Sequence, residues 1–284
     1  MGIFSGWAAT ATPPDGSQHC EALIDNNRIY RNYLGGLYIH GPSDSLLTNN
    51  MLGQNYNGPG ISIGSRTAGC LVNTCHVWGT QSSDGSLNTT DCFGFKVNAG
   101  KACLTNCVSE GSMSGNVSIE SGADMMVWVG GQVFDKSSWN TVHKGFIFQS
   151  STPSNTYIQA VQVLEHAVAS FDFSGGTSRG RRAKINANVW PNVGTTTAGA
   201  AQTGAASVIL GTPHTDCEFE LAVSTFVDSG SAPVLGGTLT GVKWNHRWGR
   251  VASATAVGSV SGKMPIYDEQ GTLVGYVPVY ASIT

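Results

Sequence analysis

The sequence has few charged residues, no long basic segment and no long apolar run. Only 12% of its 284 residues are charged and the net charge is -3, with residues 179–182 the only knot of arginines. This balance argues against nucleic acid as a partner. No stretch approaches 18 consecutive apolar residues, so the sequence predicts no membrane-spanning helix. Its N-terminus has no charged region followed by an apolar one, which argues against a signal peptide.

Apolar residues do not recur at the spacing of an amphipathic helix over any useful length. Instead, a short pattern of residues recurs, which we call the recurring phrase. A small residue is followed by apolar, any and apolar residues, as in Gly36-Leu37-Tyr38-Ile39 and Gly60-Ile61-Ser62-Ile63. The first apolar residues of the six copies are separated by 22 to 34 residues: Leu37, Ile61, Phe95, Val117, Phe146 and Phe171. The alternation predicts a strand in each copy. The period predicts stacked coils whose insertions lie in loops, an all-β solenoid.

A second recurring feature is an asparagine beside an apolar pair upstream of each phrase. Its copies are Asn26, Asn49, Asn73 and Asn106. Stacked amides can satisfy one another, and Asn tolerates the left-handed backbone of a sharp bend. We therefore predict a buried Asn ladder at these four positions.

The seven cysteines lack the paired spacing of a zinc site. Cys70 with Cys103, and Cys75 with Cys107, are predicted at equivalent positions on adjacent coils. Buried reduced thiols are the favoured interpretation, with a disulfide or metal as the alternative. No metal and no cofactor are predicted.

Three segments are expected. Residues 1–20 are a linker or remnant coil, and residues 21–242 form the solenoid. Residues 243–284 form a small C-terminal β module, because residues 264–280 contain two apolar-aromatic segments around a turn. This module is predicted to cap the solenoid or to trimerise the chain.

In their recurring Asn positions and predicted stacked strands, residues 21–230 resemble the right-handed parallel β-helix of the pectate-lyase-like superfamily. The low charge and the distinct C-terminal module are most similar to bacteriophage tailspikes or prophage tail proteins. The resemblance implies a homotrimer that binds, and often cleaves, a bacterial surface polysaccharide. It implies a location on a virion tail or outside the cell. The sequence lacks the clustered Asp residues of a pectate-lyase calcium site.

Glycoside hydrolysis needs two carboxylates that flank one sugar bond. Each Asn position is followed by a short segment that ends in an apolar residue. When the coils are aligned on this apolar residue, Glu110, Asp135 and Glu165 stand two residues beyond it on neighbouring coils. Neighbouring coils lie about 4.8 Å apart, which suits a catalytic pair. We predict this column as catalytic; solvated turn acids are the alternative. Lys96 and Asp172 project outward from the recurring phrase and are predicted to be exposed sheet charges.

Sugar faces stack on aromatic rings, so Trp78 and Trp139 are predicted to contact substrate. His143 is a further candidate for substrate contact or for the base of a lyase. The sequence thus predicts a tailspike-like protein that binds a polysaccharide and cleaves it as an endo-glycosidase. A polysaccharide lyase and a non-catalytic adhesin or structural spike are the alternatives.

Overall fold

The computed structural model describes most of the solenoid and part of the C-terminal region. The described residues are 2–6, 21–41, 44–64, 67–83, 91–135, 144–149, 155–164, 166, 169–172, 183–190, 206–209, 217–223, 243–244, 260–267 and 273–280. Side chains are described within these ranges at residues 2–3 and 21–189.

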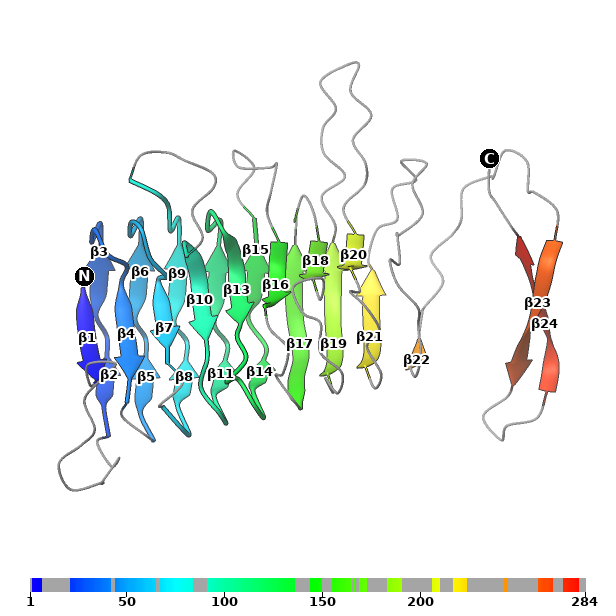
Figure 1. Cartoon of the computed structure of the whole chain (residues 1–284), viewed down its shortest axis with the longest axis horizontal. Helices are drawn as coiled ribbons and strands as arrows, with labels where there is room; N and C mark the ends of the chain where they lie inside the picture. Colours follow the sequence, from blue (N-terminus) through cyan, green and yellow to red (C-terminus); the bar gives the residue numbers. More distant parts are fainter. Residues whose placement is uncertain are drawn as a thin grey trace, which may run out of the picture. The chain divides into compact units, whose positions relative to one another are not determined.

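Each of the first five full coils contains three short strands. The first full coil has β2 (Leu23–Asp25), β3 (Arg28–Tyr30) and β4 (Leu37–His40). Figure 1 shows the coils stacked side by side, with β2, β3 and β4 in blue and later coils in cyan and green. The next four coils contain β5 (Leu46–Thr48), β6 (Met51–Gly53) and β7 (Ile61–Ile63); β8 (Leu71–Asn73), β9 (His76–Trp78) and β10 (Phe93–Val97); β11 (Cys103–Thr105), β12 (Val108–Glu110) and β13 (Gly115–Ile119); and β14 (Val127–Val129), β15 (Gln132–Phe134) and β16 (Lys144–Phe148).

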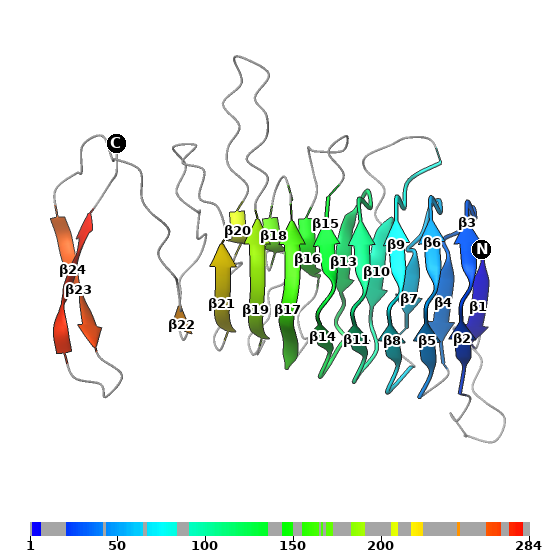
Figure 2. The same cartoon turned by 180° about the vertical axis from the view of Figure 1, so that it is seen from behind.

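The strands form two long parallel sheets, which Figure 2 shows from behind. The first sheet joins the last strand of successive coils, in the order β1 (Ile3–Gly6), β4, β7, β10, β13, β16, β18 (Ala169–Asp172) and β20 (Ala206–Ile209). The second sheet contains two rows, one starting at β2 and one at β3. These rows meet in β17 (Thr156–Leu164) and continue into β19 (Ala183–Trp190), β21 (Cys217–Val223) and β22 (Lys243–Trp244). The predicted parallel β-helix is therefore confirmed. The described residues include no helix that could cross a membrane.

The register of the recurring phrase is as the sequence predicts. Leu37 pairs with Ile61, Ile61 with Phe95 and Phe95 with Val117. Val117 pairs with Phe146, which pairs with Phe171. All six residues are fully buried. The interior is thus a stack of equivalent side chains, in which each short strand buries its apolar residues against neighbouring coils.

Aromatic rings extend this stack through the middle of the solenoid. Trp128 is fully buried and lies edge-on between Phe95 and Phe146, with centroid distances of 5.3 Å to both. Phe146 stacks on Phe171 at 5.3 Å and an interplanar angle of 11°. Trp128 is therefore a core residue.

The bend between the first two strands of a coil is left-handed, but its asparagines are exposed. Asn26, Asn49 and Asn106 have φ of 54°, 53° and 50°, and Thr74 takes this place in the third coil with φ of 53°. Asn73 instead pairs with Thr48 and Thr105 inside the strand row. The prediction of a buried ladder at Asn26, Asn49, Asn73 and Asn106 is therefore wrong, because these side chains point to solvent at the bend or on the strand.

The buried ladder lies one position later. Asn50 is fully buried: its Oδ1 accepts bonds from Asn27 N and Nδ2 at 3.1 and 3.0 Å, and its Nδ2 donates to Ile24 O at 2.8 Å. Cys75 and Cys107 follow in the same column, where each thiol donates to a backbone carbonyl of the preceding coil. The predicted equivalence of these two cysteines is confirmed.

The other predicted cysteine pair is not equivalent. Cys103 pairs with Leu71, so Cys70 lies one position earlier in its coil than Cys103 does in the next. The described cysteines, Cys70, Cys75, Cys92, Cys103 and Cys107, are all free thiols. Burial raises the pKa of Cys70 and of Cys107 to about 12, so both thiols stay protonated at neutral pH.

Residues 248–284 form a separate compact unit. Within it β23 (Val260–Tyr267) pairs antiparallel with β24 (Leu273–Tyr280), which is the predicted hairpin. Its role in trimerisation stays a prediction.

Candidate functional site

An aromatic column runs across the outer face of the second strand row. In β3, β6, β9 and β12 the middle residue is buried, so its two neighbours face outward. The register brings Tyr30, Gly53, Trp78 and Glu110 into one outward column. Neighbouring members of this column lie one coil apart, about 4.8 Å.

The indole of Trp78 lies over Gly53 on the preceding coil. A Cβ atom at Gly53 would come within 2.3 Å of Trp78 Cε2 and 2.4 Å of Cζ2. On the far side of Gly53, the ring of Tyr30 lies 5.3 Å from Trp78 at an interplanar angle of 56°. Tyr30 is 43% exposed. Because position 53 has no side chain, the two rings make one continuous aromatic surface across three coils.

Two polar side chains, His76 and Glu110, lie beside the Trp78 end of this surface. His76, on the same strand as Trp78, has its ring centroid 4.9 Å from the indole. His76 Nε2 lies 3.6 Å from Glu110 Oε2, and both side chains are about one-third exposed. We call Tyr30, His76, Trp78 and Glu110 the aromatic patch. Nearby, Arg31 Nε donates to Gln54 Oε1 at 3.0 Å in the bend beyond the strands.

Burial lowers the pKa of His76 below its ordinary value, while the Glu110 carboxylate partly offsets this by favouring the imidazolium. At neutral pH the ring is therefore mainly neutral, and it can both donate and accept a hydrogen bond. Glu110 offers two acceptor oxygens. The patch thus combines flat apolar rings with hydrogen-bonding groups at one edge.

This coupling gives a direct test. Replacing Glu110 by Gln is expected to lower the pKa of His76 further, because the substitution removes the charge that stabilises the imidazolium. NMR titration of the His76 ring protons measures the change. The matched control is Glu120→Gln on the other sheet, which should leave His76 unaffected. A His76 pKa that is unchanged or higher in Glu110→Gln would contradict the contact.

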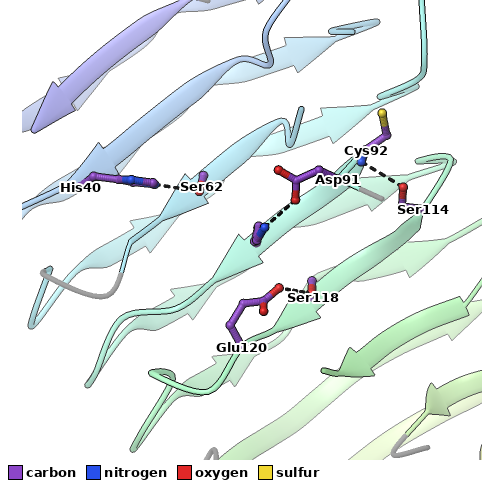
Figure 3. Close-up of polar contacts among 8 residues, drawn as sticks. His40, Ser62, Asp91, Cys92, Ser114, Ser118 and Glu120 are labelled. Atoms are coloured by element: carbon purple, nitrogen blue, oxygen red, sulfur yellow. Dashed lines mark hydrogen bonds and ion pairs between the residues drawn. The ribbon is translucent and has the colours of Figure 1, made fainter. Parts of the chain in front are cut away.

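A second polar region lies on the outer face of the first sheet (Figure 3). His40 Nε2 lies 3.0 Å from Ser62 Oγ, and Ser118 Oγ donates to Glu120 Oε1 at 2.7 Å. Lys96 Nζ pairs with Asp91 Oδ1 at 2.5 Å.

The prediction that Lys96 and Asp172 are simple exposed sheet charges is wrong. The ammonium of Lys96 is paired, and its side chain is 30% exposed. Asp172 is 1% exposed, and its Oδ2 lies 2.5 Å from Lys144 Nζ. Both outward charges of this sheet are therefore held by ion pairs.

The predicted catalytic column does not align as expected. Glu110 pairs with Trp78 and Phe134, and Gly111 occupies the bend position that Asp135 occupies in the next coil. Glu110 is half-buried on the outer face, whereas Asp135 is 3% exposed. The alignment of Glu110 with Asp135 is therefore wrong by one residue. Glu165, Trp139 and His143 lie outside the described residues, and the catalytic and binding roles of all these residues stay predictions.

Sequence reasoning identified Trp78 but overlooked Tyr30. The signal was present: one residue beyond the buried Ile29, Leu52 and Val77 the sequence has Tyr30, Gly53 and Trp78. Two aromatic residues separated by a glycine in one column predict rings that meet over the glycine.

Comparison with known proteins supports the fold. No family model matches the sequence, and no curated protein matches it. The crystal structure of pectate lyase Pel9A is similar with a TM-score of 0.50 and 15% identity, over 89% of this chain and 62% of that one. A mutant tailspike protein of E. coli bacteriophage HK620, in complex with a pentasaccharide, matches at a TM-score of 0.36 and 8% identity. That match covers 85% of this chain and 57% of the tailspike. The chain thus spans less than two-thirds of either structure, and the first likeness shows a shared fold.

Proposed function

We propose that this β-helix binds a polysaccharide across its coils at the aromatic patch. The observation that carries the proposal is the placement of the Trp78 indole over Gly53, between Tyr30 and Glu110. Sugar C–H faces pack on such rings, while sugar hydroxyls bond to groups such as Glu110 and His76. The shared fold of pectate lyase Pel9A is consistent with a polysaccharide ligand. A shared fold does not by itself assign a function, whereas the rings and polar groups of the aromatic patch provide the chemistry that binds a sugar.

Binding is favoured over cleavage at this patch. Hydrolysis needs a second carboxylate facing the same sugar bond. Glu110 is the carboxylate of the patch, and the other described candidate, Asp135, is buried. Endo-glycosidase activity through Glu110, Asp135 and Glu165 therefore remains a second hypothesis, and a lyase with His143 as base a third.

A panel of bacterial capsular polysaccharides and lipopolysaccharides tests the proposal. We expect at least one glycan to bind the immobilised protein. New reducing ends after incubation would indicate hydrolysis, and a simultaneous rise in ultraviolet absorbance would indicate a lyase. Binding without either supports a non-catalytic adhesin or spike. Failure to bind across a broad panel would contradict the proposal.

The proposal extends to the biological setting that the sequence resemblance implies. A tailspike-like protein would bind a bacterial surface glycan from a virion tail or from outside the cell, as a homotrimer. A two-stranded hairpin such as β23–β24 is marginally stable alone, and its sequence carries several apolar and aromatic residues, including Tyr267, Val277 and Tyr280.

We therefore expect residues 264–284 to associate with their copies around a threefold axis. Light scattering after size-exclusion chromatography should show a trimer for the full chain. Deletion of residues 264–284 should give monomers or aggregates. An unchanged trimer after the deletion would rule out this role for the hairpin.

A further inference from the structure

Ser62 and His40 form a hydrogen-bonded pair on the outer face of the first sheet, away from the aromatic patch. Ser62 lies in β7 between the buried Ile61 and Ile63, so its hydroxyl faces outward. His40 ends β4, the neighbouring strand. Its Nε2 lies 3.0 Å from Ser62 Oγ. Figure 3 draws this contact as a dashed line. This is the distance at which a histidine can take the proton of a serine nucleophile.

The surroundings fix the imidazole in this orientation. A Cβ atom at Gly64 would come within 2.7 Å of His40 Cδ2, so the ring lies over a glycine, as Trp78 does over Gly53. The Tyr38 ring lies 5.6 Å from the imidazole on the same strand. The imidazole therefore packs against both neighbours while its Nε2 contacts Ser62.

The charges around the pair suit an acyl transfer. Burial and the Lys96 charge lower the pKa of His40, while Asp91 partly offsets them. His40 is therefore mainly neutral at pH 7, the form that can act as a base. Burial raises the pKa of Tyr38 to about 12, so its phenol stays protonated. Lys96 is the register partner of Ser62 on β10, and Asp91 holds its ammonium.

We propose that Ser62 and His40 are the nucleophile and base of an esterase site that removes O-acyl groups from a polysaccharide. The choice of a polysaccharide ester as substrate rests on the proposed function; the Ser62–His40 chemistry does not. Because Ser62 is 4% exposed, the proposal is restricted to a small acyl group such as acetyl.

The reaction has two balanced halves. Ser62 Oγ attacks the ester carbonyl carbon while its proton passes to His40 Nε2, and the carbonyl oxygen takes the negative charge of the tetrahedral intermediate. The bond to the sugar oxygen breaks, and that oxygen takes the proton from His40. Water then attacks the acyl-Ser62 ester with His40 again as base, which releases the carboxylic acid and restores Ser62.

A fluorophosphonate probe tests the nucleophile without any glycan. We expect peptide mass spectrometry to find the probe on Ser62, and Ser62→Ala to remove the label. His40→Gln should slow labelling at least about 100-fold, because a general base contributes at least this factor. The matched control is Ser118→Ala, since Ser118 lies in the same outward column but donates to Glu120. Labelling should be unaffected in this control.

The pH dependence adds a readout that a structural role would not affect. Labelling should be constant at and above neutral pH and should fall on acidification as His40 gains a proton, because burial places the pKa of His40 below the ordinary value for histidine. Absence of label on Ser62 in the folded full-length protein would overturn the proposal. Equal labelling in His40→Gln would also overturn it.

Acetate release separates this proposal from glycan binding. Ser62→Ala should bind an O-acetylated ligand polysaccharide normally and release no acetate. Trp78→Ala should bind the polysaccharide more weakly and still react with the probe. A wild-type protein that labels at Ser62 but binds no glycan would refute the proposed function and leave the esterase chemistry intact. A wild-type protein that binds the acetylated glycan and releases no acetate would overturn the esterase.

Discussion

Replacing Trp78 by Ala is expected to weaken polysaccharide binding by about 10- to 30-fold, which corresponds to about 1.4–2 kcal/mol for a central aromatic contact. The loss is expected because Trp78 supplies the middle of the surface that starts at Tyr30 and ends at Glu110. Calorimetric titration with an oligosaccharide from a glycan that binds the wild-type protein measures the change in affinity. The matched control is Leu71→Ala, which removes a 51% exposed side chain from β8 in the same coil.

Gly53→Val tests the shape of the patch while Trp78 is kept. A Cβ atom at Gly53 collides with the indole, so the ring must leave its position over β6. We expect Gly53→Val to weaken binding by a factor similar to that of Trp78→Ala. Full affinity in both variants would show that the glycan does not contact this surface.

Replacing Asn50 by Leu is expected to cause a large loss of stability. The substitution leaves Ile24 O and the Asn27 backbone N–H without their bonds to Asn50. Each buried polar group left unpaired costs about 1–3 kcal/mol. Denaturant unfolding of the full chain, followed by circular dichroism, measures the change in midpoint.

The control for this substitution is Asn106→Gly. Asn106 is exposed at a left-handed bend, and glycine occupies the equivalent bend at Gly130 with φ of 68°. Glycine adopts this conformation without strain, so the midpoint should change little. A large loss of stability in Asn106→Gly, or none in Asn50→Leu, would contradict the assignment of the stabilising ladder to the buried position of Asn50.

The sequence predicts the fold well because the six recurring phrases bury equivalent apolar residues. Their register follows from alternation, since a shift by one residue would turn every apolar side chain outward. The bends are less regular. Thr74 takes the left-handed place that asparagine takes at Asn49 and Asn106, so aligning the asparagines alone shifts the third coil by one residue.

The misplacement of Glu110 has a similar cause. Its strand buries Ser109, where neighbouring coils bury Val77 and Val133. An alignment of apolar residues therefore selects the outward Val108 in place of Ser109. Burial of this serine is compensated by its hydrogen bonds to Asn116 O and Oδ1, at 3.2 and 3.1 Å.

Asn116, the partner of Ser109, also departs from the pattern of the other coils. It stands where other coils have Gly60 or Gly94, at a corner where a Cβ would meet an interior side chain. Its Nδ2 donates to Phe134 O at 2.8 Å and lies 2.9 Å from His166 Nε2. The burial of Asn116 cannot be recognised from local sequence alone, because its partners Phe134 and His166 lie 18 and 50 residues away along the chain.

The central claim is that a polysaccharide lies across the coils on the aromatic patch. A crystal structure of the full chain with an oligosaccharide from a glycan that binds tests it most directly. We expect a sugar ring packed on Trp78 and Tyr30, with hydroxyls bonded to Glu110 and His76. An oligosaccharide bound at another face, with Trp78 and Tyr30 left uncovered, would contradict the account.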